Sequence, residues 1–479
     1  MSTLDTLPVA VIGAGPVGLA AAAHLVRRSL PVRVYEAGAT VAANVRDWGH
    51  VRLFSPWKYN TDTAARALLK ARGWREPPGD ALPSGFDLFD AYLKPLAETP
   101  EMATAIETGA RVTAITRLGA DKVSSRDRGS RPFALAVAHA NGAIRHDLAR
   151  AVIDASGTWT TPNPLGAGGI PAAGEAAHAD RIAYGIPDVL GRDRLTYASR
   201  TVLVVGGGHS AANVLLDLAR LAEQDPTTSI LWATRGTDLR RIYGGGRADQ
   251  LPARGELGSS LKVLVDSGRI TLVPHFNATA VRSSGSRILV LGDTADGPRE
   301  LGPVDRIVVA TGQRPDLALT RELRLDLDPW LESAKALGPL IDPNLHSCGS
   351  VPPHGHRELA HPEPGFYTVG IKSYGRAPTF LMLTGYEQVR SVVAAIAGDL
   401  AAADDLRLVL PETGICASAI GPDGPTPPSG CCGGPAPATA DACCAADAEA
   451  KAKGAAGCGC AAPADRTTPD RVSAPVGCC

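Results

Sequence analysis

Short apolar runs alternate along the chain with longer stretches of helical period, and this pattern predicts an α/β protein with parallel strands. The clearest case is residues 9–36, where an apolar run at 9–12 leads through a glycine-rich turn into an alanine-rich helical stretch. A second apolar run, at 32–35, closes the segment. Strand, turn, helix and strand in this order predict a βαβ unit.

Three glycines of this unit have the spacing G-x-G-x-x-G, and an acid comes after its second strand. Gly13 permits a tight turn, Gly15 lets a pyrophosphate approach the backbone, and Gly18 allows close helix packing. The first backbone N–H groups of the helix and its dipole favour the phosphate charge. Glu36 is placed to accept the hydroxyls of an adenosine ribose. The unit therefore predicts a dinucleotide site, and the alternative is a glycine turn in an unrelated α/β protein.

A second unit of this kind covers residues 201–235, with Gly206, Gly208 and Ala211 in a G-x-G-x-x-A form. Its second strand ends at Arg235, where an NAD site would have an acid. An arginine at this place pairs with a 2′-phosphate, so we expect NADPH rather than NADH. The alternative is a solvated surface arginine.

Further strands and helices are expected around these units. A strand at 151–155 ends before Ser156 and Gly157, and a strand that starts at residue 305 ends in Thr311 and Gly312. The remaining expected elements are helices at residues 86–96 and 385–396 and strands at residues 110–115, 133–138 and 366–370.

Composition and charge limit the kinds of partner that we expect the protein to bind. The 479 residues are 44% hydrophobic, enough for sizeable cores, and 48 Lys and Arg nearly balance 49 Asp and Glu. The sequence has no basic stripe of the kind that binds nucleic acid, so we expect a small-molecule substrate. No apolar run reaches the roughly 18 residues needed to span a bilayer, and no signal peptide pattern begins the chain. We therefore expect a soluble, cytoplasmic protein that does not bind membranes.

The cysteines are confined to the last third of the chain. All ten lie after residue 347, which excludes a secreted disulfide framework. From residue 411 the composition shifts to Gly, Pro, Ala, Ser and Thr, which cannot support a packed core, so we expect a disordered tail. Eight cysteines stand there in four pairs: Cys431 and Cys432, Cys443 and Cys444, Cys458 and Cys460, and Cys478 and Cys479.

Paired thiolates in this tail suit a soft ion such as As(III), Cu(I) or Hg(II). Their irregular intervals match no zinc-finger spacing. Cys348 and Cys416 are further possible ligands, although a buried, inert thiol is the commoner fate. The alternative for the whole tail is a disordered segment without a specific ligand.

The two units together resemble the flavoproteins with two dinucleotide-binding domains, and the returning segment DRIVVATGQRPD (305–316) completes the resemblance. It implies FAD on the first unit, NADPH on an inserted second unit, and a chain that then returns to the FAD domain. The expected domains are residues 1–195, 196–304, 305–410 and the tail, 411–479. The residues expected to bind the two cofactors are Gly13, Gly15, Gly18, Glu36, Gly157, Gly206, Gly208, Ser210, Arg235, Thr311 and Gly312.

Within this superfamily, disulfide reductases need a CxxC or CxxxxC pair beside the flavin, and the two units contain no cysteine. The string DASGTW (154–159) instead looks like a strand end of the monooxygenases. Gly370 is followed by Ile371 and Lys372, whereas family members commonly have Gly-Asp there. Lys372 is thus a candidate for positive charge near the flavin. Trp48 and Arg52, in a loop that either packs beneath a lid or contacts the flavin, are the other catalytic candidates.

The chain also resembles flavin monooxygenases encoded with arsenic-resistance genes, through GHVRLFSPW (49–57), DQLPARGELG (249–258) and the stretch 370–399. This resemblance implies NADPH-driven oxidation of a trivalent arsenical, such as methylarsenite, to the pentavalent form by O2 through a peroxyflavin. Two alternatives stay open. One is an FAD- and NADPH-dependent reductase that passes electrons through Cys348 and the tail to a metal ion or thiol. The other is a protein that sequesters soft metals.

Overall fold

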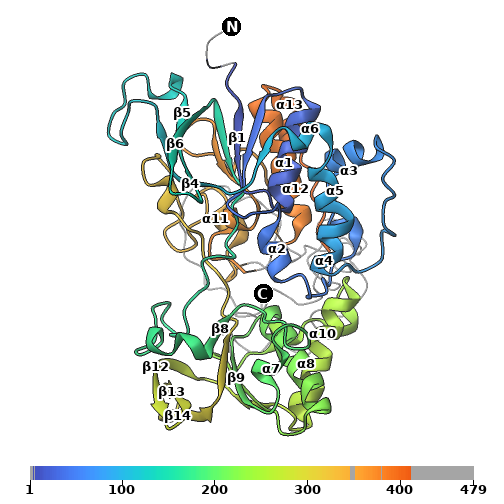
Figure 1. Ribbon diagram of the computed structural model, residues 1–479, viewed down its shortest axis with the longest axis vertical. Helices are drawn as coiled ribbons and strands as arrows, with labels where there is room; N and C mark the ends of the chain where they lie inside the picture. Colours follow the sequence, from blue (N-terminus) through green and yellow to red (C-terminus); the bar gives the residue numbers. More distant parts are fainter. Residues whose placement is uncertain (1–3, 5, 346–350, 379, 412–479) are drawn as a thin grey trace, which may run out of the picture. The chain divides into compact units, whose positions relative to one another are not determined.

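The computed structural model describes residues 4, 6–345, 351–378 and 380–411. It is a mixed α/β structure built on two parallel sheets, as the sequence predicts (Figure 1). The first sheet has the strand order β16-β7-β1-β2-β3. Its strands, all parallel, are β1 (Val9–Ile12), β2 (Val32–Tyr35), β3 (Ile106–Glu107), β7 (Ala151–Asp154) and β16 (Phe366–Thr368).

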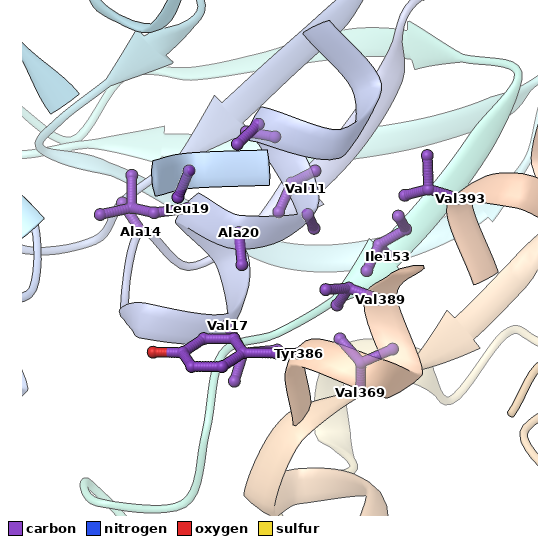
Figure 2. Close-up of a cluster of buried hydrophobic side chains, with 14 of the residues drawn as sticks. Val11, Ala14, Val17, Leu19, Ala20, Ile153, Val369, Tyr386, Val389 and Val393 are labelled. Atoms are coloured by element: carbon purple, nitrogen blue, oxygen red, sulfur yellow. The ribbon is translucent and has the colours of Figure 1, made fainter. Parts of the chain in front are cut away.

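Helices cover one face of this sheet. The side chains of Val9 and Val11 point to that face, where α1 (Pro16–Arg27) packs against α12 (Met382–Ile396). Figure 2 shows Val17 of α1 close to Tyr386 and Val389 of α12 in this apolar cluster. Helix α12, near the end of the described chain, therefore packs on α1, near its beginning.

An antiparallel sheet covers the other face. It consists of β4 (Ala110–Arg117), β5 (Phe133–His139) and β6 (Ile144–Ala149). Ala10 and Ile12, which alternate with the helix-facing residues of β1, join the core beneath it. Glu363 accepts hydrogen bonds from Arg117 and Arg128 at 2.8 Å each, and all three side chains are buried. This ion network ties the returning segment to the antiparallel sheet.

The second parallel sheet repeats the design. Its strand order is β11-β10-β9-β15-β8. The strands are β8 (Ile182–Tyr184), β9 (Thr201–Val205), β10 (Ser229–Ala233), β11 (Thr271–Val273) and β15 (Arg306–Val309). One face packs on α8 (His209–Gln224) and α10 (Pro252–Asp266), and the other on β12 (Asn277–Ser284), β13 (Arg287–Thr294) and β14 (Gly297–Val304). Because β8 and β15 belong to it, this sheet extends beyond residues 196–304, the limits expected from the sequence.

The remaining elements are short. The helices among them are α2 (Ala43–Asp47), α3 (Thr63–Lys70), α4 (Gly85–Leu88), α5 (Lys94–Ala97), α6 (Pro100–Ala103), α7 (Arg194–Tyr197), α9 (Arg240–Tyr243), α11 (Gly338–Ile341) and α13 (Leu400–Asp404). The tighter or wider turns are η1 (Trp57–Tyr59), η2 (Phe89–Leu93), η3 (Arg128–Ser130), η4 (Ala176–Arg181), η5 (Gly246–Ala248), η6 (Ala318–Thr320) and η7 (Gly370–Tyr374).

Most expected elements are present. The helix expected at 86–96 runs from α4 to α5 with a π-helical segment between them, and the strand expected at 366–370 ends at Thr368, after which η7 begins. The hydrophobic pattern did not predict α10, β6 or the sheet β12-β13-β14. Among the described residues, no helix is long and apolar enough to cross a membrane.

Candidate nucleotide-binding sites

The first glycine loop has the geometry that its sequence predicts. Gly13 has φ +93°, and a Cβ there would lie 2.8 Å from the carbonyl oxygen of Ala155. A Cβ on Gly18 would lie 1.9 Å from the oxygen of Gly13, so only glycine allows α1 this close to the loop. A Cβ on Gly15 would meet no heavy atom within 4 Å. The loop thus leaves open space at the one glycine expected to face a pyrophosphate.

Glu36 is bound to this loop at the end of β2. Its Oε2 accepts from the backbone N–H of Ala14 at 2.8 Å, and its Oε1 accepts from that of Gly38 at 2.7 Å. A carboxylate oxygen has a second lone pair, so each oxygen can still accept a ribose hydroxyl. Glu36 therefore shapes the loop as well as being the expected ribose ligand.

Two helix N-termini meet at this edge of the first sheet. A Cβ on Gly385, in the first turn of α12, would lie 2.6 Å from Cγ2 of Val17, in the first turn of α1. Gly370 has φ +71° and approaches Val17 in the same way. Because both dipoles point their positive ends here, the edge favours anionic ligand groups.

A buried ion pair lies at the ends of β7 and β16. Lys372 Nζ donates to Asp154 Oδ2 at 2.7 Å and to Ser156 Oγ at 3.0 Å. Ser156 Oγ donates to Asp154 Oδ1 at 2.6 Å, and Lys372 and Asp154 are 2% and 0% exposed. The charge of Lys372, which the sequence offered as a candidate for the flavin, is therefore balanced by Asp154. Gly157, with φ +74°, comes directly after Ser156.

Trp48 and Arg52, the other catalytic candidates, have separate surroundings. The Trp48 ring packs over Gly85, where a Cβ would lie 2.8 Å from it. Arg52 is exposed, and its backbone forms a β-bridge with Ser84. These contacts fit the first interpretation of the loop, packing under cover, and leave the catalytic role of both residues a prediction.

The second glycine loop is more open than the first. Gly206 has φ +140°, and a Cβ on it would lie 2.2 Å from the oxygen of Ala310. Gly207 and Gly208 are exposed, and a Cβ on either would meet nothing within 4 Å. Ser210 is the second residue of α8, so its N–H is one of the first, unpaired donors of that helix.

Arg235 stands at the end of β10, where the sequence places it, and its side chain is exposed. Its Nη1 donates to the carbonyl oxygen of Ala167 at 3.1 Å. At the end of β15, Thr311 Oγ1 donates to the oxygen of Asn163 at 3.2 Å, and Gly312 has φ +88°. Sequence reasoning missed Asn163, whose Nδ2 returns a bond to the oxygen of Thr311 at 3.0 Å.

Sequence reasoning also missed a group of side chains near the second loop. The ring centroids of Phe54 and His209 are 5.2 Å apart, and the Arg254 guanidinium lies 5.9 Å from the Phe54 centroid. Arg254 is buried and ion-paired with Asp249 at 2.7 Å. Burial and, secondarily, the charge of Arg254 lower the pKa of His209 from 6.5 to about 4. The strings 49–57 and 249–258 were the available signal, because they supply Phe54 and Arg254.

All ten cysteines, including Cys348 and Cys416, lie outside the described residues. Within the described part of the chain, no group of three or more His, Cys, Asp and Glu side chains is arranged to hold a metal ion.

A family model, that of the pyridine nucleotide-disulphide oxidoreductases, matches residues 7–332. The chain belongs to this family. It is a flavin-dependent oxidoreductase, and its cofactors are FAD and NAD(P)H. The open space at Gly15 and at Gly208 is consistent with both. A ferredoxin–NADP reductase from Salinispora tropica is 29% identical over 332 residues, which are 68% of this chain and 80% of that protein.

Solved structures of several other proteins show the same fold. Bacillithiol disulfide reductase from Bacillus cereus has a TM-score of 0.60 at 15% identity, covering 82% of this chain and 99% of its own. A cadaverine monooxygenase of desferrioxamine biosynthesis from Erwinia amylovora has a TM-score of 0.56 at 12% identity, covering 81% of this chain and 94% of its own. An ornithine N-hydroxylase from Kutzneria has a TM-score of 0.54 at 16% identity, covering 82% of this chain and 99% of its own. Reductases and monooxygenases thus share the fold, which does not choose between their reactions.

Proposed function

We propose that the chain is an NADPH-dependent flavoprotein monooxygenase whose substrate is a trivalent arsenical, such as methylarsenite, and whose oxidant is O2. The observation that carries the proposal is the distribution of cysteine: residues 1–347, which include everything that the family model matches, contain none. A disulfide reductase needs a thiol pair beside its flavin to pass electrons on. Electrons that reach the flavin here have no such exit within the two units, which favours O2 as acceptor.

The electron balance of this reaction is complete with the reactants named. NADPH gives up a hydride, and As(III) gives up two electrons on becoming As(V). One oxygen atom of O2 becomes bonded to arsenic, and the other leaves as water with the hydride equivalent and one proton. FAD, when bound, supplies the two-electron chemistry that joins these steps.

The chain's own residues bind and orient the two cofactors. Gly15 and Glu36 hold FAD, while Gly208, Ser210 and Arg235 hold NADPH by its phosphates. The converging N-termini of α1 and α12 favour negative charge at the edge of the first sheet. The neutralised Lys372–Asp154 pair holds η7 against the end of β7.

The test is NADPH consumption with and without O2 across arsenite, methylarsenite, organic amines and Hg(II). We expect consumption that depends on O2, is stimulated by a trivalent arsenical, and yields one pentavalent product per NADPH. Anaerobic consumption at an equal rate with Hg(II) would refute the proposal and establish a reductase.

The reductase is the second candidate, and one observation favours it. Pro411 is the last described residue before the paired cysteines. It lies beside Arg254, and Arg254 Nη2 donates to the carbonyl oxygen of Pro411 at 3.5 Å. The described chain therefore ends next to the group formed by Phe54, His209 and Arg254. This attachment also suits a tail that captures a thiophilic substrate and raises its local concentration.

A chain ending at Pro411 separates these roles. If the tail captures substrate, truncation raises KM for the arsenical and leaves kcat nearly unchanged. If the tail carries electrons, truncation abolishes kcat at saturating substrate. Unchanged KM and kcat would mean that the tail has neither role.

A further inference from the structure

Phe54 and His209 join the two nucleotide-binding units. Phe54 lies in the loop between α2 and η1 of the first unit, and His209 is the first residue of α8, directly after Gly208. Their rings are tilted by 51° with centroids 5.2 Å apart, a geometry that is favourable for aromatic pairs. The first unit therefore contacts the residue directly after the second glycine loop.

His209 does not act as a charge in this contact. Arg254 and Asp249 form a buried ion pair beside it, and their charges act on His209 in opposite senses. With its pKa lowered by burial, the imidazole is neutral at physiological pH. A neutral ring lacks the full charge that would attract a phosphate, and the contact that the structure shows for this ring is its packing against Phe54.

The position of His209 makes this packing consequential. The backbone N–H groups of the first turn of α8 are the donors expected to hold the pyrophosphate of NAD(P)H. Arg235 marks the adenosine side of that pyrophosphate, so the nicotinamide half extends to the other side. The backbone N–H of His209 therefore lies at the expected NAD(P)H site, and its side chain contacts the first unit, which is expected to bind FAD.

We propose that Phe54 is a positioning residue: through His209 and α8 it sets the distance between the nicotinamide of NAD(P)H and the flavin. Hydride transfer needs the reacting atoms at about 3 to 3.5 Å, and a misplacement of about 1 Å can slow such a step about 100-fold. Phe54 touches neither reacting group in this scheme. It acts on the geometry of the reductive step and leaves both binding sites intact.

The experiment measures each of these properties in the full-length holoenzyme. For Phe54→Ala we expect anaerobic flavin reduction at saturating NADPH to slow about 10- to 100-fold. FAD content and the Kd for NADP⁺, measured by calorimetry, stay within about threefold of wild type, because no nucleotide-binding group changes. Hydrogen exchange of the α8 amides increases, which reports looser docking independently of turnover.

Phe86→Ala is the matched control. Phe86 packs over Gly49 in the same loop, where a Cβ would lie 2.4 Å from its ring, and is 47% exposed. It makes the loop's contact within the first unit, so its loss leaves the reduction rate near wild type. Phe54→Tyr preserves the ring and restores the rate lost in Phe54→Ala.

Three outcomes would overturn the proposal. Equal slowing in Phe54→Ala and Phe86→Ala would mean that the loop has a general structural role. A rise in the Kd for NADP⁺ that accounts for the slowing would make Phe54 part of the binding site. A wild-type reduction rate would remove the role altogether. If Phe54→Ala fails to bind FAD, Phe54→Leu and His209→Gln test the same contact from both sides, with the same expected slowing.

Discussion

The two nucleotide-binding units have one architecture and opposite chemistry at equivalent places. Each is a parallel sheet with helices on one face and a three-stranded antiparallel sheet on the other. Where the second strand of the βαβ ends, the first unit has Glu36, bound by backbone N–H groups, and the second has Arg235, exposed. An acid accepts ribose hydroxyls and an arginine binds phosphate, so we expect FAD on the first unit and NADPH on the second.

The units also differ in the residue directly after the second glycine of each loop. The first helical residue is Pro16 in α1 and His209 in α8. Proline provides neither a donor nor a titratable group at that place, whereas His209 provides a backbone N–H and a ring that packs against the other unit. The first loop is thus a self-contained site, and the second is coupled to its neighbour.

The largest expected effect comes from a larger side chain at Gly15 or at Gly208, which should exclude the nucleotide of one unit and leave the other bound. Gly15 has φ −77° and Gly208 has φ −115°, ordinary values for any residue, and open space surrounds both. We therefore expect Gly15→Val to fold and to be purified with almost no FAD, and Gly208→Val to keep FAD and lose NADPH binding. Flavin absorbance and NADP⁺ calorimetry on both variants check this. Full flavin in Gly15→Val, or loss of flavin in Gly208→Val, would contradict the assignment of the two units.

The next effect tests the charge difference. Arg235 donates to the Ala167 carbonyl through Nη1, and its other N–H groups can bind a 2′-phosphate. We expect Arg235→Ala to weaken NADPH binding by about 1.5 to 3 kcal/mol, the range for a bond to a charged group, and to leave NADH nearly unchanged. Arg299→Ala, an exposed arginine on β14 of the same unit, is the control and changes neither. Equal losses for the two nucleotides in Arg235→Ala would show that the arginine does not read the phosphate.

Local signals made both units predictable from the sequence. A glycine loop, its strand and its terminal charge lie within about 35 residues, and each glycine has a steric reason that depends on near neighbours. The expected elements therefore agree with the structure around both loops. In contrast, β6 is an edge strand with few buried residues, and its pattern carries little signal.

The rest of the candidate site depends on contacts between distant residues. Lys372 and Asp154 are 218 positions apart, and Lys372 is recognisable as half of a buried pair only once β7 and β16 lie side by side. Phe54 meets His209 only after both units have folded. Residue types and spacing contain no measure of such proximity. Sequence reasoning therefore offered Lys372 as a positive charge near the flavin or its phosphates, or else as a solvated lysine, and assigned Phe54 no individual role.

The smallest expected effect concerns acid stability, because only the second unit has a titratable side chain at the start of its helix. The pKa of His209 is about 4 in the folded protein and about 6.5 when exposed. Between these values the unfolded chain binds more protons, so this residue makes the protein less stable as pH falls below about 6.5. From pH 7.5 to pH 5 its share is at most about 2 kcal/mol, reduced by its partial exposure to solvent.

The comparison of wild type with His209→Gln isolates this share. Asp217, on the same face of α8, has a raised pKa and acts in the opposite sense, gaining stability as pH falls, but it is present in both proteins. Glutamine keeps the polar shape of the side chain without the titration. We therefore expect the thermal midpoint to fall less between pH 7.5 and pH 5 in His209→Gln than in wild type, with saturating FAD in both. Equal falls would mean that His209 is solvated in the native state, and that its ring is not held against Phe54 as the structure describes.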